Sequence, residues 1–299
     1  MIRCVNRRLL LVHAHPDDES SQSAATIARY CAAGDQVTLV TCTLGERGEI
    51  LVPELEHLSE AELGEHRIAE LGQAMAHMGL TDQVFLGGAG RYHDTGMDRS
   101  PDGTVIVPDI SPSNAFWHAD LLEAANFLVE IIRDRKPQVV STYNPFGGYG
   151  HPDHIQAHRV ATYAVALAGT PSHRPDLGEP WTVSRMVWSV HNTMTWKKAY
   201  PLAKKEFPDL FDGAQRDPES FGPPERDIVC VVPIGELYDV TRKALGSHPS
   251  QVNMDDVFWR FHGMVNQLDG AGEAYVYASG VPFPPSEIPH DDLFAGLEL

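Results

Sequence analysis

An apolar run near the start of the chain ends abruptly in a cluster of charged and imidazole side chains. Residues 9–12 read Leu-Leu-Leu-Val, and residues 13–19 read His-Ala-His-Pro-Asp-Asp-Glu. A short apolar run of this kind is typical of a parallel strand that is buried on both faces. Pro16 ends the strand, and the acidic residues after it favour the start of a helix. We therefore expect His15 and Asp18 at the carboxyl end of a strand, where open α/β sheets bind ligands.

The first half of the chain alternates strand-like and helix-like segments. Short runs rich in β-branched residues alternate with longer segments whose apolar residues recur at helical spacing. The expected strands cover 8–14, 36–41, 84–86 and 138–143, and the expected helices cover 18–32, 60–79, 117–134 and 151–167. Because parallel strands are joined by right-handed helical crossovers, this order predicts a Rossmann-like, mostly parallel sheet flanked by helices.

Two proline- and glycine-rich segments, 169–182 and 214–226, are typical of boundaries. Around and beyond them the expected strands cover 184–191, 227–233 and 274–279, and the expected helices cover 192–205, 235–247 and 253–268. We therefore expect a Rossmann-like domain over residues 1–170 and a smaller C-terminal α/β lobe over residues 171–299. The lobe is expected to pack on the first domain and complete its pocket, with residues 95–115 forming a long loop over the site.

The composition restricts the classes of partner. The 299 residues include 23 basic and 41 acidic side chains, a net charge of −18. Such a balance disfavours binding to phosphates, so nucleic acid and anionic membranes are not expected as partners. The longest apolar runs are much shorter than the roughly 20 residues of a membrane helix. Four widely separated cysteines and the lack of a signal-peptide pattern predict a reduced, cytoplasmic protein.

A second cluster repeats the pattern of the first. After the expected strand over 138–143, residues 144–154 read Asn-Pro-Phe-Gly-Gly-Tyr-Gly-His-Pro-Asp-His. Because both strands are parallel, both clusters are expected at the same edge of the sheet. A catalytic zinc typically takes three protein ligands and leaves one position open, and His15, Asp18 and His154 supply such a set. Zinc in this position would polarise a carbonyl group and lower the pKa of its water.

Neighbouring side chains complete a site for hydrolysis of an amide. A carboxylate that is not a ligand must take the proton of the water and pass it to the leaving amine, and Asp17 is the candidate. His151 lies three residues before His154, so both face the same side of a first helical turn. We expect Asp153 to hold His151 in its protonated state, as a donor to a developing oxyanion. Tyr149, on a segment flanked by glycines, is expected to reach the same oxygen.

The two clusters resemble the motifs of the LmbE-like (PIG-L) family of zinc N-acetylglucosaminyl deacetylases, and most closely those of its mycothiol branch. The resemblance covers most of the chain and also includes the segments 40–46, 67–70, 86–91 and 94–97. It implies one zinc ion per subunit on His15, Asp18 and His154, with Asp17 as the general base. It also implies a role for three further residues in substrate binding: the sugar hydroxyls are contacted by Arg67 and Asp94, and the inositol side is near Glu46.

The activity that this resemblance implies is removal of acetate from an N-acetylglucosamine linked to inositol, a step of mycothiol biosynthesis. The alternative within the branch is the mycothiol S-conjugate amidase, in which a lysine follows the first motif. Gln22 stands at that place here and favours the deacetylase, as does the region 273–280. Asn144 and Phe146 depart from the family pattern, and neither is a proposed ligand.

Other interpretations of the same residues remain open. His154 and His158 have the spacing of helical zinc sites, and Fe²⁺ would accept the same ligands as zinc. Asp17 and Asp18 would also stabilise a helix N-terminus without any catalysis. A dinucleotide-binding oxidoreductase would need a glycine-rich turn after the first strand, and a glycosidase would need two separated carboxylates. A non-catalytic sugar-binding protein is a further alternative. The oligomeric state is not predicted.

Overall fold

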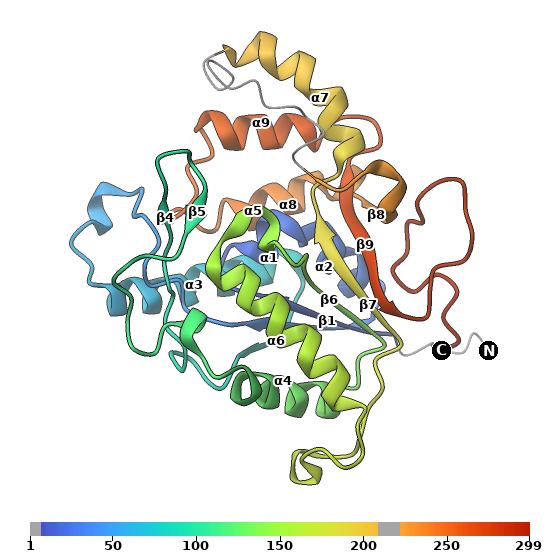
Figure 1. The fold of residues 1–299 in the computed structure, drawn as a ribbon. Helices are drawn as coiled ribbons and strands as arrows, with labels where there is room; N and C mark the ends of the chain where they lie inside the picture. Colours follow the sequence, from blue (N-terminus) through green and yellow to red (C-terminus); the bar gives the residue numbers. More distant parts are fainter. Residues whose placement is uncertain (1–6, 209–221) are drawn as a thin grey trace.

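A computed structural model describes residues 7–208 and 222–299. The strands of its main sheet are β1 (Arg8–His13), β2 (Gln36–Thr41), β3 (Asp82–Phe85), β6 (Val139–Tyr143), β7 (Arg185–Val190), β8 (Ile228–Pro233) and β9 (Gly272–Gly280). They lie in the order β3-β2-β1-β6-β7-β9-β8 (Figure 1). The first five are mutually parallel, and β9 is antiparallel to both of its neighbours. The predicted α/β architecture with a mostly parallel sheet is therefore confirmed.

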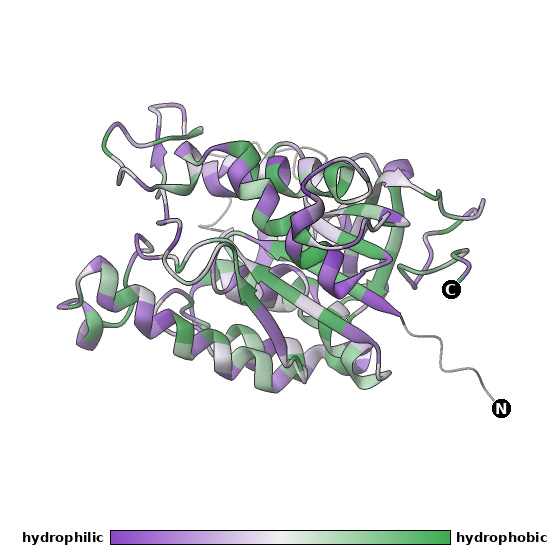
Figure 2. Ribbon diagram, turned by 90° about the horizontal axis from the view of Figure 1, so that it is seen from below, coloured by the Kyte–Doolittle hydropathy of each residue, from purple (hydrophilic) through white to green (hydrophobic). Residues whose placement is uncertain are grey.

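Helices cover both faces of this sheet. The α-helices of the described residues are α1 (Asp18–Gln22), α2 (Ala24–Ala32), α3 (Glu60–Met78), α4 (Leu121–Arg135), α5 (Gly147–Gly150), α6 (Pro152–Ala168), α7 (Thr193–Glu206), α8 (Tyr238–Leu245) and α9 (Val257–Val265). Those that share core clusters with the sheet are α2, α3, α4, α6 and α8. One core cluster contains Leu10 and Val12 of β1 with residues of α4 and α6. The other contains Leu9 and Leu11 with residues of α2, α3 and α8. This alternation confirms that β1 is buried on both faces, and Figure 2 shows hydrophobic strands between the helical layers.

The strands of the expected C-terminal lobe extend the same sheet. β7 pairs in parallel with β6, and Cys230 of β8 and Tyr275 of β9 share a core cluster with residues of β1. α7 and α9 pack on each other around a third, smaller cluster. The boundary expected at 214–226 falls mostly outside the described residues, which resume at residue 222.

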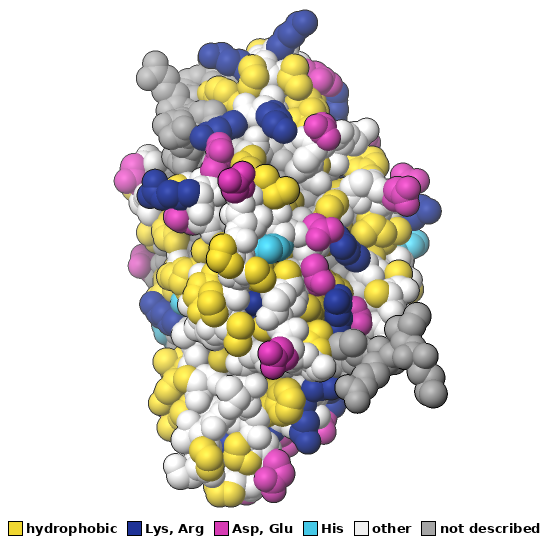
Figure 3. Space-filling model, turned by 90° about the vertical axis from the view of Figure 1, so that its right-hand side faces the viewer, with side chains coloured by type: hydrophobic (Ala, Val, Ile, Leu, Met, Phe, Trp, Pro, Cys, Tyr) yellow, Lys and Arg dark blue, Asp and Glu magenta, His cyan; other side chains and the backbone are white. Residues whose placement is uncertain are grey.

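Two surface properties bear on possible partners. On the face shown in Figure 3, basic and acidic side chains are interspersed. Among residues 7–208 and 222–299, no helix combines the length and the apolar character that crossing a membrane requires.

The helix expected after the first cluster is broken at Ser23, which has a φ of −142°. Its Oγ lies 3.1 Å from Nε2 of the buried His13. The backbone N–H groups of Ala25 and Thr26, at the start of α2, donate to the carboxylate of Glu273 at 2.7 Å each. A carboxylate from β9 therefore completes the N-terminus of α2, and the local sequence does not contain this partner.

The order of the strands reverses at β1, because β2 and β3 lie on one side of it and β6 and β7 on the other. The crevice at the carboxyl ends of β1 and β6 is therefore the topological switch point, where such sheets bind ligands. The first cluster follows β1 and the second follows β6. The long loop expected over residues 95–115 contains a small hairpin, β4 (Asp98–Arg99) and β5 (Val105–Ile106), and β5 contacts α5 beside the crevice.

Candidate active site

Two imidazole rings face a single carboxylate at the switch point. His15 Nδ1 lies 3.3 Å from Asp18 Oδ2, and His154 Nε2 lies 3.3 Å from Asp18 Oδ1. The other ring nitrogens have partners of their own. His154 Nδ1 donates to the Gly147 carbonyl oxygen at 3.1 Å, and His15 Nε2 donates to an Asp153 carboxylate oxygen at 3.2 Å. These bonds leave the lone pairs of His15 Nδ1 and His154 Nε2 directed at the carboxylate.

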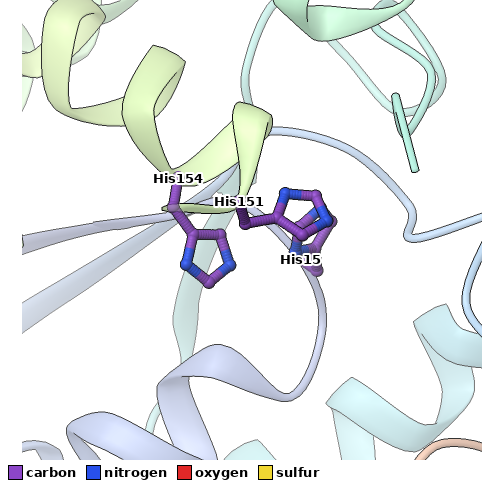
Figure 4. Close-up of side chains that lie close together, drawn as sticks. All are labelled: His15, His151 and His154. Atoms are coloured by element: carbon purple, nitrogen blue, oxygen red, sulfur yellow. The ribbon is translucent and has the colours of Figure 1, made fainter. Parts of the chain in front are cut away.

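This donor set fits a metal ion. His154 Nε2 is buried and has no hydrogen-bond partner among the described residues. Figure 4 shows the rings of His15, His151 and His154 gathered where α6 begins. Two imidazole lone pairs and a carboxylate are donors that a divalent cation such as zinc accepts, with further positions left for water or substrate. Two buried groups have donor atoms that all lie within 4.8 Å of one another: His15, His151 and His154, and His15, Asp94 and Asp153; Asp18 belongs to neither.

The carboxylate of Asp17, the residue next to Asp18, is suited to accept a proton. Its side chain is 25% exposed, and its Oδ2 accepts a hydrogen bond from Arg67 Nη2 at 2.9 Å. Burial raises the pKa of Asp17 to about 6, against the opposing effect of the Arg67 charge. A base is most effective when its pKa lies near the operating pH. The geometry therefore suits Asp17 to the role of general base.

His151 is a neutral N–H donor in this structure. Its Nδ1 accepts a hydrogen bond from the backbone N–H of Asp153 at 3.1 Å, so its Nε2 carries the proton. Burial holds the pKa of His151 well below its usual value. The expectation that the Asp153 carboxylate holds a protonated His151 is wrong. That carboxylate instead pairs with His15 and accepts hydrogen bonds from the backbone N–H, at 2.9 Å, and the hydroxyl of Thr95.

Tyr149 lies over the mouth of the site. Its ring centroid is 5.2 Å from that of His154 and 6.1 Å from that of His151, and the residue is 46% exposed. The short helix α5 that carries it contains Gly148 at φ +74°, a conformation that glycine adopts without strain. The structure therefore places Tyr149 beside His151 and His154, and its contact with a substrate oxygen stays a prediction.

The three residues expected to bind substrate form a wall of the site next to Asp17. Arg67, Asp94 and Glu46 are 2%, 3% and 4% exposed. Arg67 Nη1 donates to the Gly45 carbonyl oxygen at 2.6 Å, and Glu46 accepts a hydrogen bond from the backbone N–H of Asp94 at 3.0 Å. The structure thus brings all three together, and their contact with a sugar stays a prediction.

Tyr143, the last residue of β6, supports both histidines proposed as ligands and was not singled out from the sequence. Its ring stacks on His154, with centroids 4.2 Å apart and planes inclined by 17°. Its hydroxyl accepts a hydrogen bond from the backbone N–H of Ala14 at 2.8 Å and lies 3.3 Å from His13 Nδ1. An aromatic residue at the end of a strand that leads into a ligand cluster is the signal that indicates such a role.

Replacing Tyr143 with phenylalanine is expected to weaken zinc binding by about 10-fold or more, as loss of a supporting residue does in zinc sites. The ring still stacks on His154, but the N–H beside His15 loses its acceptor, which also costs about 1–3 kcal/mol of stability. A competition titration against a chromophoric chelator and a denaturant unfolding curve measure the two effects. Tyr30→Phe is the matched control, since the Tyr30 hydroxyl accepts the Leu293 N–H at 2.8 Å in another part of the core. Equal zinc affinity in both variants would contradict the role of Tyr143.

The comparisons with known proteins identify the family of this chain. The family model for GlcNAc-PI de-N-acetylase (PIG-L) matches residues 10–165, which include both clusters. The 1D-myo-inositol 2-acetamido-2-deoxy-alpha-D-glucopyranoside deacetylase of Kribbella flavida is 47% identical over 300 residues, covering 98% of each chain. The protein of the same name from a Nocardioides species is 47% identical and covers 98% of this chain and 99% of its own.

A solved structure shows the same fold at lower sequence identity. N,N'-diacetylchitobiose deacetylase from Pyrococcus horikoshii superposes with a TM-score of 0.61 at 18% identity, covering 91% of this chain and 83% of its own. At that identity the likeness extends to the fold alone. The family match over half of the chain and the full-length relatives carry the assignment. The chain belongs to the GlcNAc-PI de-N-acetylase (PIG-L) family.

Proposed function

We propose that this protein is a cytoplasmic zinc-dependent hydrolase that removes acetate from 1D-myo-inositol 2-acetamido-2-deoxy-alpha-D-glucopyranoside. The observation that carries the proposal is the convergence of the His15 and His154 rings on the Asp18 carboxylate, with the carboxylate of the adjacent Asp17 held by Arg67. The full-length relatives that bear the name of this deacetylase support the substrate. Zinc is the proposed metal, one ion per chain, and Fe²⁺ would accept the same donors.

The proposed reaction breaks the amide C–N bond and gives acetate and a free amine. When bound, the cation would polarise the amide carbonyl and favour a nucleophilic water at neutral pH. The ionised Asp17 accepts the proton of the attacking water and returns it to the amine nitrogen as the C–N bond breaks. Arg67 donates to the carboxylate of Asp17 at 2.9 Å, so the orientation of the base is fixed by this bond.

Two donors stabilise the charge that develops on the carbonyl oxygen. His151 presents its Nε2–H, because its Nδ1 is occupied by the backbone N–H of Asp153. The phenol of Tyr149, at the mouth of the site, donates to the same oxygen. The phenol keeps its proton at neutral pH, because the ordinary pKa of tyrosine is about 10. We further propose that Arg67, Asp94 and Glu46 line the sugar side of the pocket.

Gln22, the residue that favours the deacetylase over the amidase, contacts the proposed metal ligand Asp18. Its Nε2 donates to Asp18 Oδ1 at 3.1 Å, and its Oε1 accepts a hydrogen bond from Ser189 Oγ at 3.4 Å. A neutral amide at this position fits the deacetylase, whereas the amidase of the same branch carries a lysine. We therefore propose the deacetylase reaction, with hydrolysis of a mycothiol S-conjugate as the alternative.

Offered both compounds side by side, the zinc-loaded enzyme is expected to hydrolyse the N-acetyl-glucosaminyl-inositol faster than a mycothiol S-conjugate. The expected excess in kcat/KM is at least about 10-fold, a difference of about 1.4 kcal/mol in transition-state binding. Release of the primary amine, followed with an amine-reactive fluorophore, measures both reactions in one format. Faster hydrolysis of the conjugate would replace the proposed activity with the amidase.

A further inference from the structure

The backbone of the proposed catalytic base is held in an uncommon conformation. Asp17 has a φ of +120°, a region that residues with a side chain rarely adopt. Such conformations persist only where the surroundings hold them, and they are concentrated at functional sites. The contacts that hold Asp17 are therefore candidates for a role in catalysis.

Glu19 holds the backbone of Asp17 from one side. Its Oε2 accepts a hydrogen bond from the Asp17 N–H at 2.9 Å. Its Oε1 accepts from Ser20 Oγ at 2.6 Å and from His248 Nε2 at 2.9 Å. The Glu19 and His248 side chains are completely buried, so water does not compete for this carboxylate. The carboxylate of Glu19 thus links the backbone of the base to an imidazole from the far end of the chain.

The turn that contains His248 is anchored through Ser250 on α3, the helix that also carries Arg67. His248 lies in the turn after α8, which contacts α1 and α3 (Figure 1). Two residues later, the backbone N–H and hydroxyl of Ser250 donate to the carboxylate of Glu70 at 2.9 and 2.7 Å. Glu70 lies one turn after Arg67 on α3, and Arg67 donates to the carboxylate of Asp17 and to the carbonyl oxygen of the preceding proline.

We propose that His248 is a positioning residue. Acting through Glu19, it holds the general base Asp17 in the position and orientation that the reaction with the substrate requires. The inference rests on the proposed function, because it takes Asp17 as the base. His248 contacts neither the donor set nor the mouth of the site. A purely structural role would cost stability, whereas a positioning role changes turnover through Asp17 alone.

His248→Ala is expected to lower kcat on the order of 10–100-fold, because small misplacements of a reacting group have effects of that size. KM and the ratio of zinc to protein are expected to stay unchanged. His248→Gln, whose amide can donate to Glu19 in place of Nε2, is expected to recover part of the loss. Ser247→Ala is the matched control: its hydroxyl donates to the Lys243 carbonyl oxygen at 2.9 Å in the same turn, without touching Glu19. That control is expected to keep the wild-type kcat.

A double-mutant cycle separates positioning from general damage to the fold. In the Asp17→Asn background, His248→Ala is expected to cause no further loss of kcat, since the group through which it acts is gone. An equal loss in both backgrounds, or a loss of zinc in proportion to the loss of kcat, would overturn the proposal.

Amide hydrogen exchange at Asp17, followed by NMR, tests the same link without any substrate. His248→Ala is expected to accelerate exchange of this N–H, and Ser247→Ala is expected to leave it unchanged. If the wild-type enzyme failed to hydrolyse the inositol glycoside while exchange still accelerated, the proposed function would fall and the link to Asp17 would stand. Unchanged exchange in His248→Ala would overturn the link itself.

Discussion

Replacing Asp17 with asparagine is expected to lower kcat by about 10²–10⁴-fold, the usual contribution of a general base. The asparagine oxygen can still accept the hydrogen bond that Arg67 donates at 2.9 Å, so the side chain keeps its place. The amide cannot take up a proton at neutral pH, so the step that Asp17 performs is lost. Because Asp17 is not one of the three proposed ligands, the zinc content is expected to match the wild type. Steady-state kinetics and metal analysis of the same preparation measure both quantities.

Glu65→Gln is the matched control for this variant. Glu65 is an exposed carboxylate of α3, two residues before Arg67, and it belongs to no contact of the site. Its replacement removes one negative charge near the active site and is expected to leave kcat and metal content unchanged. Loss of zinc from Asp17→Asn would show that Asp17 is a ligand and would reverse the roles proposed for Asp17 and Asp18.

The pH dependence of the reaction has an expected sign. Burial raises the pKa of Asp17 to about 6, and the base must be ionised to act. The value of kcat/KM is therefore expected to rise with pH through this range and level off above it. A cation on the neighbouring donors favours the ionised form, so in the zinc enzyme the midpoint is expected at or below about pH 6. In Asp17→Asn, the residual kcat/KM is expected not to show this rise with pH.

Local patterns predicted the elements whose determinants lie close together in the chain. The helix expected over 60–79 is present as α3, because Ser59 and Glu62 form a capping box and Gly79 ends it at φ +72°. The break at Ser23 could not be predicted, since Glu273, which completes the start of α2, is 248 residues from Ala25. The hairpin of residues 98–106 was likewise expected as an irregular loop.

In the site, too, contacts within one motif or between neighbouring strand ends could be predicted, whereas contacts with distant segments could not. His15 and Asp18 share one motif, and a parallel sheet places the second motif beside the first, so their proximity could be inferred. The hydrogen-bond partners of the Asp153 carboxylate could not be inferred. They depend on the orientation of the His15 ring and on the position of Thr95, which the local sequence does not determine. His248 carries no local signal at all. It follows an unremarkable helix, and only the packing of α8 against α1 brings it to Glu19.

Replacing a proposed ligand is expected to have the second large effect. His154→Ala should weaken zinc binding by clearly more than the roughly 10–100-fold that loss of a supporting residue causes. The reason is that Nε2 of His154 is the buried nitrogen without a hydrogen-bond partner in the described chain. Activity should fall with the bound zinc, and excess zinc should restore part of it. Removal of zinc from the wild type with a chelator should abolish activity, and added zinc should recover it.

His158→Ala is the matched control on the same helix, one turn further on. Its Nδ1 donates to the Tyr143 carbonyl oxygen at 2.9 Å, and its ring packs on Trp188, away from the donor set. This variant is expected to bind zinc as the wild type does. Comparable loss of zinc in His158→Ala and His154→Ala would favour the pair of helical ligands instead.

Two further variants distinguish the proposed ligands from the set that contains His151. We expect Asp18→Ala to lose zinc, since one carboxylate oxygen of Asp18 lies 3.3 Å from His15 Nδ1 and the other lies 3.3 Å from His154 Nε2, the two proposed histidine ligands. We expect His151→Ala to keep zinc and lose turnover. The Nδ1 of His151 is already occupied by a backbone N–H, so one nitrogen remains for function. That nitrogen cannot bind a cation and donate a proton to an oxyanion at once, so retention of zinc in His151→Ala would assign it to the oxyanion.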